Sequence, residues 1–289
     1  MKELISLVDK KLDEYLQITY PEDIFKAMKY TLMLPGKRLR PVMCLETVRM
    51  LGGDIQKALP MACAIEMLHV QSLIHDDLPC MDNDDFRRGK PSNHKVFGEA
   101  NAVLAGDALL TYAPQLIIEK SKSLACDVVL KLVHEYTKFA GAYALIAGQV
   151  VDIESEGGRL TKTPKETLEF IHMNKTAALF RLAIRSGAIV AGVEESVLEE
   201  LDNFAKSFGL AFQIYDDIMD EISTFEELGK TIGKDKNSGK LTYVSLYGLE
   251  EAKEKFGLLL NNCYDIVGKY DSEIFRIILN KLRDRILGV

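Results

Sequence analysis

The chain has 289 residues, 47% hydrophobic and 27% charged, which is the composition of an ordinary soluble globular protein. Its formal net charge of −7 argues against general nucleic-acid binding, which needs a basic surface. The longest uncharged stretch, 139–151, is too short to cross a membrane. The N-terminus lacks an apolar signal-type run and the five cysteines form no CxxC pair, so we expect a cytoplasmic protein with buried, reduced thiols.

Most of the chain shows the 3.6-residue spacing of apolar residues that is typical of helices. Predicted helices cover 4–16, 22–34, 41–50, 56–78, 100–120, 125–149, 164–191, 195–220, 243–270 and 271–287. Two segments, 61–74 and 177–193, are apolar on more than one face and should lie inside a bundle. Period-two runs, βαβ alternation and low-complexity linkers are all missing from the sequence. It therefore predicts an all-α fold in a single domain, 1–289.

The polar stretch 75–90 holds the densest group of chemically active side chains. Five aspartates fall between Asp76 and Asp85, and two arginines and a lysine follow them. Bundled carboxylates without a Cys or His pair at ligand spacing favour a hard cation such as Mg²⁺. Arginine forks bind phosphate through two hydrogen bonds. The stretch therefore predicts a site where metal ions and basic groups hold a phosphate together; a solvated acidic loop is the alternative.

Pro79 decides how the first acidic cluster is arranged. Asp76 and Asp82 are six residues apart and would not share a face of a straight helix. Proline disfavours helix at the preceding Leu78 and removes a backbone donor. We therefore expect the helix to end near Leu78 and the following loop to bring Asp82 back.

A second acidic cluster follows far along the chain, at Asp216, Asp217 and Asp220. Asp216 and Asp220 are four residues apart, so they share one helix face, where like charges repel. A divalent cation would offset this repulsion. The motif alone is equally compatible with an exposed acidic turn, but with the first cluster present it favours a metal site. Two such clusters on facing helices could hold a diphosphate through bridging metal ions.

Basic residues are concentrated at a few points. The segment 36–41, Gly-Lys-Arg-Leu-Arg-Pro, places three cations at a turn between two helices, as either a second anion site or a helix-end cation cluster. Lys175 lies in an apolar helix, where a lysine needs a reason. His69 shares a helix with Asp76 and is either a packed core histidine or a site residue. Two further lysines, Lys230 and Lys240, lie in a glycine-rich basic loop after the second acidic cluster.

Taken together, these motifs resemble the trans-isoprenyl diphosphate synthases, in particular the short-chain bacterial farnesyl/geranylgeranyl type. The resemblance rests on the DD-x4-D motif at 76–82 with Arg87-Arg88-Gly89, the DDxxD motif at 216–220 and the GKRLRP segment at 36–41. It runs from about Tyr20 to the C-terminus. The two-residue insertion Pro79-Cys80 matches the bacterial and plant form of the first motif.

The resemblance implies a fold, a reaction and an assembly. The fold would be a single-domain bundle of about ten or more helices around a deep central cavity. Isopentenyl diphosphate would be condensed head to tail with an allylic substrate, dimethylallyl or geranyl diphosphate, after Mg²⁺-assisted ionisation of the allylic diphosphate. The protein would be a homodimer, without a nucleic-acid partner or an integral membrane segment.

The resemblance also assigns roles to residues. More than one Mg²⁺ would be bound, with Asp76, Asp82 and Asp216 as ligands, Asp77 and Asp220 in support, and Asp217 in the catalytic set. The allylic diphosphate would be held by Arg87, Lys175, Lys230 and Lys240. Isopentenyl diphosphate would be held without metal by Lys37, Arg40, His69 and Arg88. The oxygen dipoles of Thr176 and Gln213 would steady the carbocation.

Chain length of the product depends on the cavity floor. In bacterial farnesyl synthases that resemble this chain, an aromatic residue five positions before the first Asp often blocks the cavity. That position is Gln71 here, with Ser72 next to it. We expect (2E,6E)-farnesyl diphosphate, with geranylgeranyl diphosphate as the alternative.

Two remoter readings remain. A terpene cyclase would usually carry a different second motif and would not need a second diphosphate site. A non-catalytic regulatory subunit of a prenyl synthase would be expected to lose one Asp motif, whereas this chain keeps both.

Overall fold

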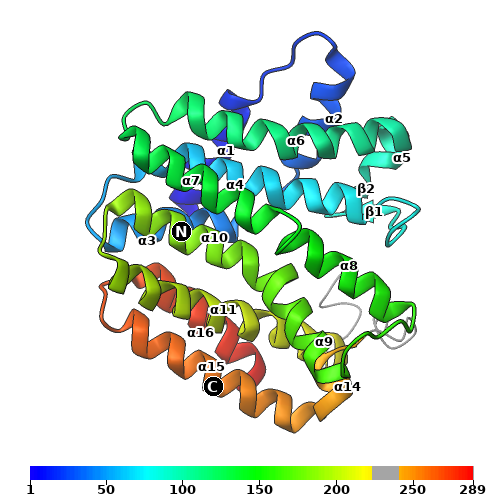
Figure 1. The fold of residues 1–289 in the computed structure, drawn as a ribbon, viewed down its shortest axis with the longest axis vertical. Helices are drawn as coiled ribbons and strands as arrows, with labels where there is room; N and C mark the ends of the chain where they lie inside the picture. Colours follow the sequence, from blue (N-terminus) through cyan, green and yellow to red (C-terminus); the bar gives the residue numbers. More distant parts are fainter. Residues whose placement is uncertain (223–240, 289) are drawn as a thin grey trace. The chain divides into compact units, whose positions relative to one another are not determined.

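The computed structural model describes residues 1–222 and 241–288, and in these ranges the regular structure is almost entirely helical (Figure 1). The predicted all-α fold class is therefore confirmed. The helices are α1 (Lys2–Tyr15), α2 (Glu22–Leu32), α3 (Leu39–Met50), α4 (Ile55–Asp76), α5 (Asn93–Phe97), α6 (Glu99–Lys120), α7 (Cys126–Ala140), α8 (Leu145–Glu156), α9 (Pro164–Ile171), the π-helical turn η1 (His172–Thr176), α10 (Ala177–Ala191), α11 (Glu195–Ile222), α14 (Tyr243–Tyr247), α15 (Leu249–Val267) and α16 (Glu273–Leu287).

Two predicted helices are each divided by non-helical residues, and a third, 164–191, contains the π-helical turn η1. The segment 125–149 covers α7 and the first part of α8, which are separated by the non-helical residues 141–144; at Ala144, just before α8, φ is −138° and ψ is −106°. The segment 243–270 forms α14 and α15. Between them lies Gly248 with φ of 84°, a left-handed conformation that favours glycine. Apolar periodicity continues across both breaks, so it did not reveal them.

The sequence analysis also missed a short hairpin. Strands β1 (Phe86–Arg87) and β2 (Lys90–Pro91) pair antiparallel, with Arg87 opposite Lys90. The two residues of the turn, Arg88 and Gly89, have φ of 52° and 76°. Positive φ at both central positions is what a type I′ turn requires. The hairpin therefore fixes the backbone of both arginines of the first motif.

The chain divides into two compact units. Unit 1 comprises Met1–Thr137 and Arg185–Val193, and unit 2 comprises Lys138–Ile184 and Glu194–Val289. The expected single domain stays a prediction. In unit 1, α4 packs against α1, α2, α3 and α6, and residues 58–68 are all buried. Such burial of large apolar side chains contributes about 1.5–3 kcal/mol each. The predicted interior position of this helix is confirmed, and it ends where the first acidic motif begins.

Unit 2 is organised around α11, which packs against η1, α14, α15 and α16. Aromatic rings fill its interior. The rings of Phe180 and Phe208 lie 5.0 Å apart between centroids, and those of Phe204 and Phe275 lie 5.2 Å apart. Both pairs meet edge to face, a favourable arrangement of ring quadrupoles. The second acidic motif lies near the C-terminal end of this well-packed helix.

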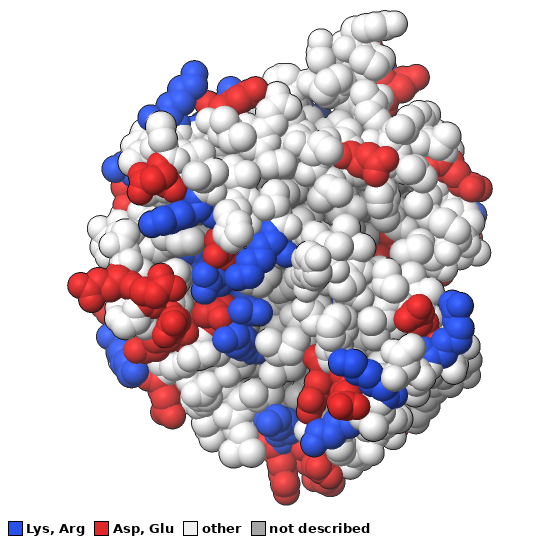
Figure 2. Space-filling view, viewed as in Figure 1, with Lys and Arg blue, Asp and Glu red and all other residues white. Residues whose placement is uncertain are grey.

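No helix in residues 1–222 and 241–288 is long and apolar enough to cross a membrane. On the face drawn in Figure 2, basic and acidic side chains lie beside one another. All five cysteines are free thiols. Cys44, Cys63 and Cys263 are buried as expected, whereas Cys80 and Cys126 are exposed, contrary to the expectation for all five.

Candidate active site

The first acidic motif forms a compact loop at the end of α4. The helix ends at Asp76, and the N–H of Asp82 donates a hydrogen bond of 2.8 Å to the carbonyl oxygen of Asp76. The N–H groups of Met81 and Asn83 both donate to the carbonyl oxygen of Leu78, at 2.9 and 3.1 Å. The predicted return of Asp82 toward Asp76 is therefore confirmed. Asp76 is half-buried and Asp82 exposed, so this loop presents two carboxylates from one small region.

Asp77, unlike Asp76 and Asp82, is buried and is only 1% exposed. Burial raises the pKa of its carboxyl group, and the hydrogen bonds from Arg87 oppose that shift. The Arg87 Nε lies 3.0 and 3.2 Å from the two carboxylate oxygens, and its Nη2 donates to the same group and to Asp84. Asp77 therefore holds Arg87 in place and is not presented to solvent as a ligand.

Arginines gather around His69 in unit 1. Burial lowers the pKa of His69 well below its usual value, and nearby positive charges lower it further, namely those of Arg40, Arg88, Arg87 and Arg38. His69 is therefore neutral at physiological pH. An added Cβ at Gly36 would lie 2.7 Å from Arg88 Nη1, so glycine lets the 36–41 turn approach the guanidinium. The structure thus brings His69, Arg40 and Arg88 together, while Lys37 is exposed on the same turn.

Arg38 has a structural role that sequence reasoning missed. Its side chain is 1% exposed and donates to Glu66 Oε1 at 2.7 Å, to Asp9 Oδ1 at 2.7 Å, and to the carbonyl oxygens of Leu32 and Leu34 at 2.9 and 3.1 Å. Its own φ of 45° is left-handed. Arg38 therefore ties α1, α4 and the end of α2 to the turn that carries Lys37 and Arg40. Spacing along the chain gave no signal that distinguished this arginine from its neighbours.

The second acidic motif divides by helix face. Asp216 is exposed and Asp220 half-buried, one helical turn apart on α11, as the four-residue spacing predicted. Asp217 is 6% exposed. One of its oxygens accepts from Gln213 Nε2 at 2.9 Å, and the other accepts from the backbone N–H of Tyr243 at 2.8 Å and lies 3.8 Å from His172 Nε2. Asp217 thus holds neighbouring groups in place, while Asp216 and Asp220 remain toward solvent.

The π-helical turn η1 carries two of the predicted residues. The Lys175 ammonium lies 2.5 Å from Asp152 Oδ2 on α8, and the Thr176 hydroxyl donates to Gln213 Oε1 at 2.7 Å. Together with the Gln213–Asp217 bond, these contacts join η1 to α8 and α11 within unit 2. Single π turns within helices are frequent at functional sites. Asp152 was missed, although a lone acid in the apolar run 145–153 was an available signal.

The helix face before Asp76 holds the expected cavity-floor residues. Gln71 is 9% exposed, and its Nε2 lies 3.0 Å from His75 Nδ1. His75 Nε2 lies 3.1 Å from the carbonyl oxygen of Val103 on α6. Because a carbonyl only accepts, Nε2 must donate, so Nδ1 accepts from the Gln71 amide. Gln71 is therefore held by a chain of hydrogen bonds, and Ser72 beside it donates to the carbonyl oxygen of His69 at 2.8 Å.

Some predicted site residues are not placed together. Lys230 and Lys240 lie outside the described residues. In the described ranges, no group of three or more His, Cys, Asp or Glu side chains is arranged to hold a metal ion. The available donors are nevertheless carboxylate oxygens, Asp76 and Asp82 in one unit and Asp216 and Asp220 in the other. This is the donor chemistry that Mg²⁺ prefers.

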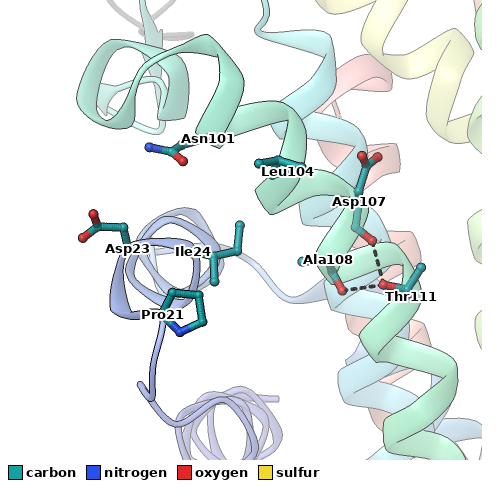
Figure 3. A pocket seen from close by; sticks show the side chains of 8 residues that line it. All are labelled: Pro21, Asp23, Ile24, Asn101, Leu104, Asp107, Ala108 and Thr111. Carbon is teal, nitrogen blue, oxygen red and sulfur yellow. Dashed lines mark hydrogen bonds between the residues drawn. The ribbon is translucent and has the colours of Figure 1, made fainter.

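Two pockets lined by described residues contain none of the predicted site residues. A pocket of about 520 Å³ lies between the start of α2 and α6, with Ile24 and Leu104 on its two sides (Figure 3). A second pocket, of about 340 Å³ in unit 2, is lined by His172 and Tyr243, which both contact Asp217, and by apolar side chains of α11 and α15. It therefore lies directly behind the buried carboxylate of the second motif.

Comparison with known proteins identifies the family. A family model described as polyprenyl synthetase matches residues 21–281. The chain is 44% identical over 271 residues to a dimethylallyltranstransferase of Fischerella ambigua, which covers 94% of this chain and 78% of that protein. It is 49% identical over 269 residues to the large subunit 1 of a heterodimeric geranylgeranyl pyrophosphate synthase of Arabidopsis thaliana, which covers 92% and 72%.

Solved structures agree with the sequence relatives. An FPP/GFPP synthase of Zymomonas mobilis superposes with a TM-score of 0.88 at 32% identity, over 98% of this chain and 97% of that one. A geranyltransferase of Helicobacter pylori, complexed with magnesium and isoprenyl diphosphate, superposes with a TM-score of 0.84 at 31% identity, over 100% and 96%. With both acidic motifs and the arginine-rich turn in place, the chain belongs to the polyprenyl synthetase family of trans-isoprenyl diphosphate synthases.

Proposed function

We propose that this protein is a short-chain prenyltransferase that condenses isopentenyl diphosphate with an allylic diphosphate. The allylic carbon–oxygen bond breaks and the diphosphate leaves with the electron pair. The double bond of isopentenyl diphosphate then attacks the allylic carbon, and the departing diphosphate takes the proton that is lost. The main support is the group of His69, Arg40 and Arg88 in the same unit as the carboxylate loop of Asp76 and Asp82.

We propose Asp76, Asp82 and Asp216 as ligands of more than one Mg²⁺, with Asp220 in support. When bound, Mg²⁺ acts as a Lewis acid that stabilises charge on the leaving diphosphate. The exposure of Asp82 and Asp216 and the accessible position of Asp76 support this assignment. Asp77 and Asp217 act differently, because each is buried and accepts hydrogen bonds that orient Arg87 and Gln213.

The basic residues divide into two proposed anion sites. One site would hold isopentenyl diphosphate without metal, through Arg40, Arg88, neutral His69 and exposed Lys37. A neutral imidazole there can donate a hydrogen bond, and the guanidinium groups supply the charge. Arg87, Lys175, Lys230 and Lys240 would hold the allylic diphosphate. Thr176 and Gln213 share a hydrogen bond, and their oxygens would face the developing carbocation.

The first experiment identifies the product. Purified protein with isopentenyl diphosphate, dimethylallyl diphosphate and Mg²⁺ should yield farnesyl diphosphate, the product that the sequence analysis favours. Geranylgeranyl diphosphate is the second candidate, because Gln71 offers no aromatic ring and several relatives are named geranylgeranyl synthases. If Gln71 forms the floor, Gln71→Tyr should shorten the product. Failure to extend any allylic primer would refute the proposed reaction.

We also propose a cytoplasmic homodimer. Unit 2 carries an apolar face beside and along α8, where Tyr143, Ile146, Val150 and Ile153 are 94%, 47%, 49% and 38% exposed at helical spacing. Apolar faces of this kind commonly mark protein interfaces. Light scattering should give the mass of a dimer for the purified chain, and Val150→Glu should lower it toward the 32.4 kDa of one chain. An unchanged dimer mass in this variant would place the interface elsewhere.

A further inference from the structure

The most informative contact outside the proposed ligand set joins Asp152 to Lys175. Asp152 lies on α8 and is 4% exposed, and its Oδ2 lies 2.5 Å from the Lys175 ammonium. The Lys175 side chain keeps 25% of its surface exposed. The carboxylate thus lies on the protein side of the ammonium, and part of the lysine remains accessible to a ligand.

A glycine brings α8 to this lysine. An added Cβ at Gly148 would lie 2.4 Å from the backbone nitrogen of Lys175 and 2.8 Å from its Cα. Gly148 and Asp152 are four residues apart and share one face of α8. The same face therefore contacts Lys175 twice, at the backbone through Gly148 and at the ammonium through Asp152. One helix, α8, therefore fixes both the backbone and the charged group of Lys175.

The other side of η1 is fixed by α11. Thr176 donates to Gln213, whose amide donates to the buried Asp217. Asp217 in turn accepts from the backbone N–H of Tyr243. The π turn therefore contacts both α8 and α11, through the side chains of the adjacent residues Lys175 and Thr176.

A free lysine side chain loses rotamer entropy when it is ordered. Because Asp152 already contacts the ammonium, Lys175 loses this entropy when the protein folds and not when the ligand binds. We propose that Asp152 is a positioning residue, which holds the Lys175 ammonium where the allylic diphosphate binds. The inference rests on the proposed function, because that assigns Lys175 to the allylic diphosphate.

The change in diphosphate affinity when Asp152 is neutralised distinguishes a positioning role from mere proximity to the site. A carboxylate that only lay near the site would repel a diphosphate, so its neutralisation would tighten diphosphate binding. A carboxylate that positions Lys175 is required, so its neutralisation weakens binding. Asp152→Asn removes the charge at nearly constant shape and is the variant to test.

A matched control is available in the same unit. Asp202 is 5% exposed and accepts from Arg181 at 2.8 and 2.9 Å, so it is as buried and as strongly paired as Asp152. Neither residue of that pair belongs to the proposed site. Asp202→Asn should therefore lower the melting temperature without a selective effect on the allylic substrate.

The experiment measures binding by calorimetry, with Mg²⁺ and an unreactive thio analogue of dimethylallyl diphosphate as one probe and isopentenyl diphosphate as the other. Asp152→Asn should weaken analogue binding about tenfold to hundredfold, the range for a misplaced binding group. Isopentenyl diphosphate binding should stay at the wild-type value. In a Lys175→Met background, Asp152→Asn should have no further effect on the analogue. Should Asp152→Asn not fold, Asp152→Glu is tested in the same way, since it keeps the charge but displaces the ammonium.

Tighter or unchanged analogue binding in Asp152→Asn would overturn the positioning role. So would a loss shared equally by both probes, a loss equal to that of Asp202→Asn, or a full loss that persists in the Lys175→Met background. These results leave the proposed function standing if the wild type still forms product. A wild-type protein that binds neither probe and forms no product overturns the proposed function, and the inference with it.

Discussion

Arg38 offers a direct test of how the GKRLRP turn is built. The sequence places it among three cations of one motif, but in the structure it is buried and bonded to Glu66, Asp9 and two backbone carbonyl groups. Arg38→Met keeps most of the aliphatic volume and removes the guanidinium. Among the described residues, Glu66, which is 1% exposed, would then keep Arg88 as its only ion-pair partner, with Nη2 3.8 Å from Glu66 Oε1.

Breaking a buried ion pair by removing one partner costs about 3–5 kcal/mol, because a buried charge is left without compensation. The two carbonyl groups of Leu32 and Leu34 lose a donor as well, so the upper part of this range applies. Each kcal/mol lowers the melting temperature of a protein of this size by about 2–4 °C. We therefore expect a decrease of roughly 10–15 °C for Arg38→Met.

Thermal unfolding followed by circular dichroism measures this change. Lys37→Met is the matched control, because Lys37 is the preceding residue of the same turn but is exposed, and its melting temperature should stay close to wild type. An Arg38→Met protein that melts within about 2 °C of wild type would refute the structural role of the Arg38 contacts with Glu66 and Asp9. Arg38 would then be only one of the cations of the turn.

Three further predictions concern the site and the packing. Asp76→Ala should lower turnover by orders of magnitude, each tenfold being about 1.4 kcal/mol of barrier, and unchanged steady-state kinetics would remove Asp76 from the metal ligands. The pKa of His69 in the folded protein lies well below its unfolded value of about 6.5, so below that pH only the unfolded chain takes up the proton. As the pH decreases further, the free energy of unfolding should fall by about 1.4 kcal/mol per pH unit. His69→Gln should flatten this slope in denaturant titrations from pH 7.5 to 5. Gly187→Ala places a Cβ 2.5 Å from the carbonyl oxygen of Cys44 and should lower the free energy of unfolding by about 1–3 kcal/mol. Gly257→Ala, with open space around the added Cβ, should leave the stability unchanged or raise it, and thermal unfolding measures both variants.

Much of the fold could be predicted because it depends on local rules. Apolar periodicity identified nearly all of the long helices, and the continuous apolar character of 61–74 placed α4 in the interior. Pro79 predicted the end of that helix and the return of Asp82. The four-residue spacing of Asp216 and Asp220 predicted their shared face. Each of these depends on residues within a few turns of one another, so the sequence contains the whole cause.

Only the tertiary structure decided which charges meet. Arg38 and Lys37 are adjacent in the sequence, yet one is buried against Glu66 and the other is exposed. Asp152 and Lys175 are 23 residues apart, and they form a pair because Gly148 lets α8 approach η1. A charged residue acquires its role from the partner that packing brings to it. That partner lies on another helix, where no local pattern of the chain can indicate it.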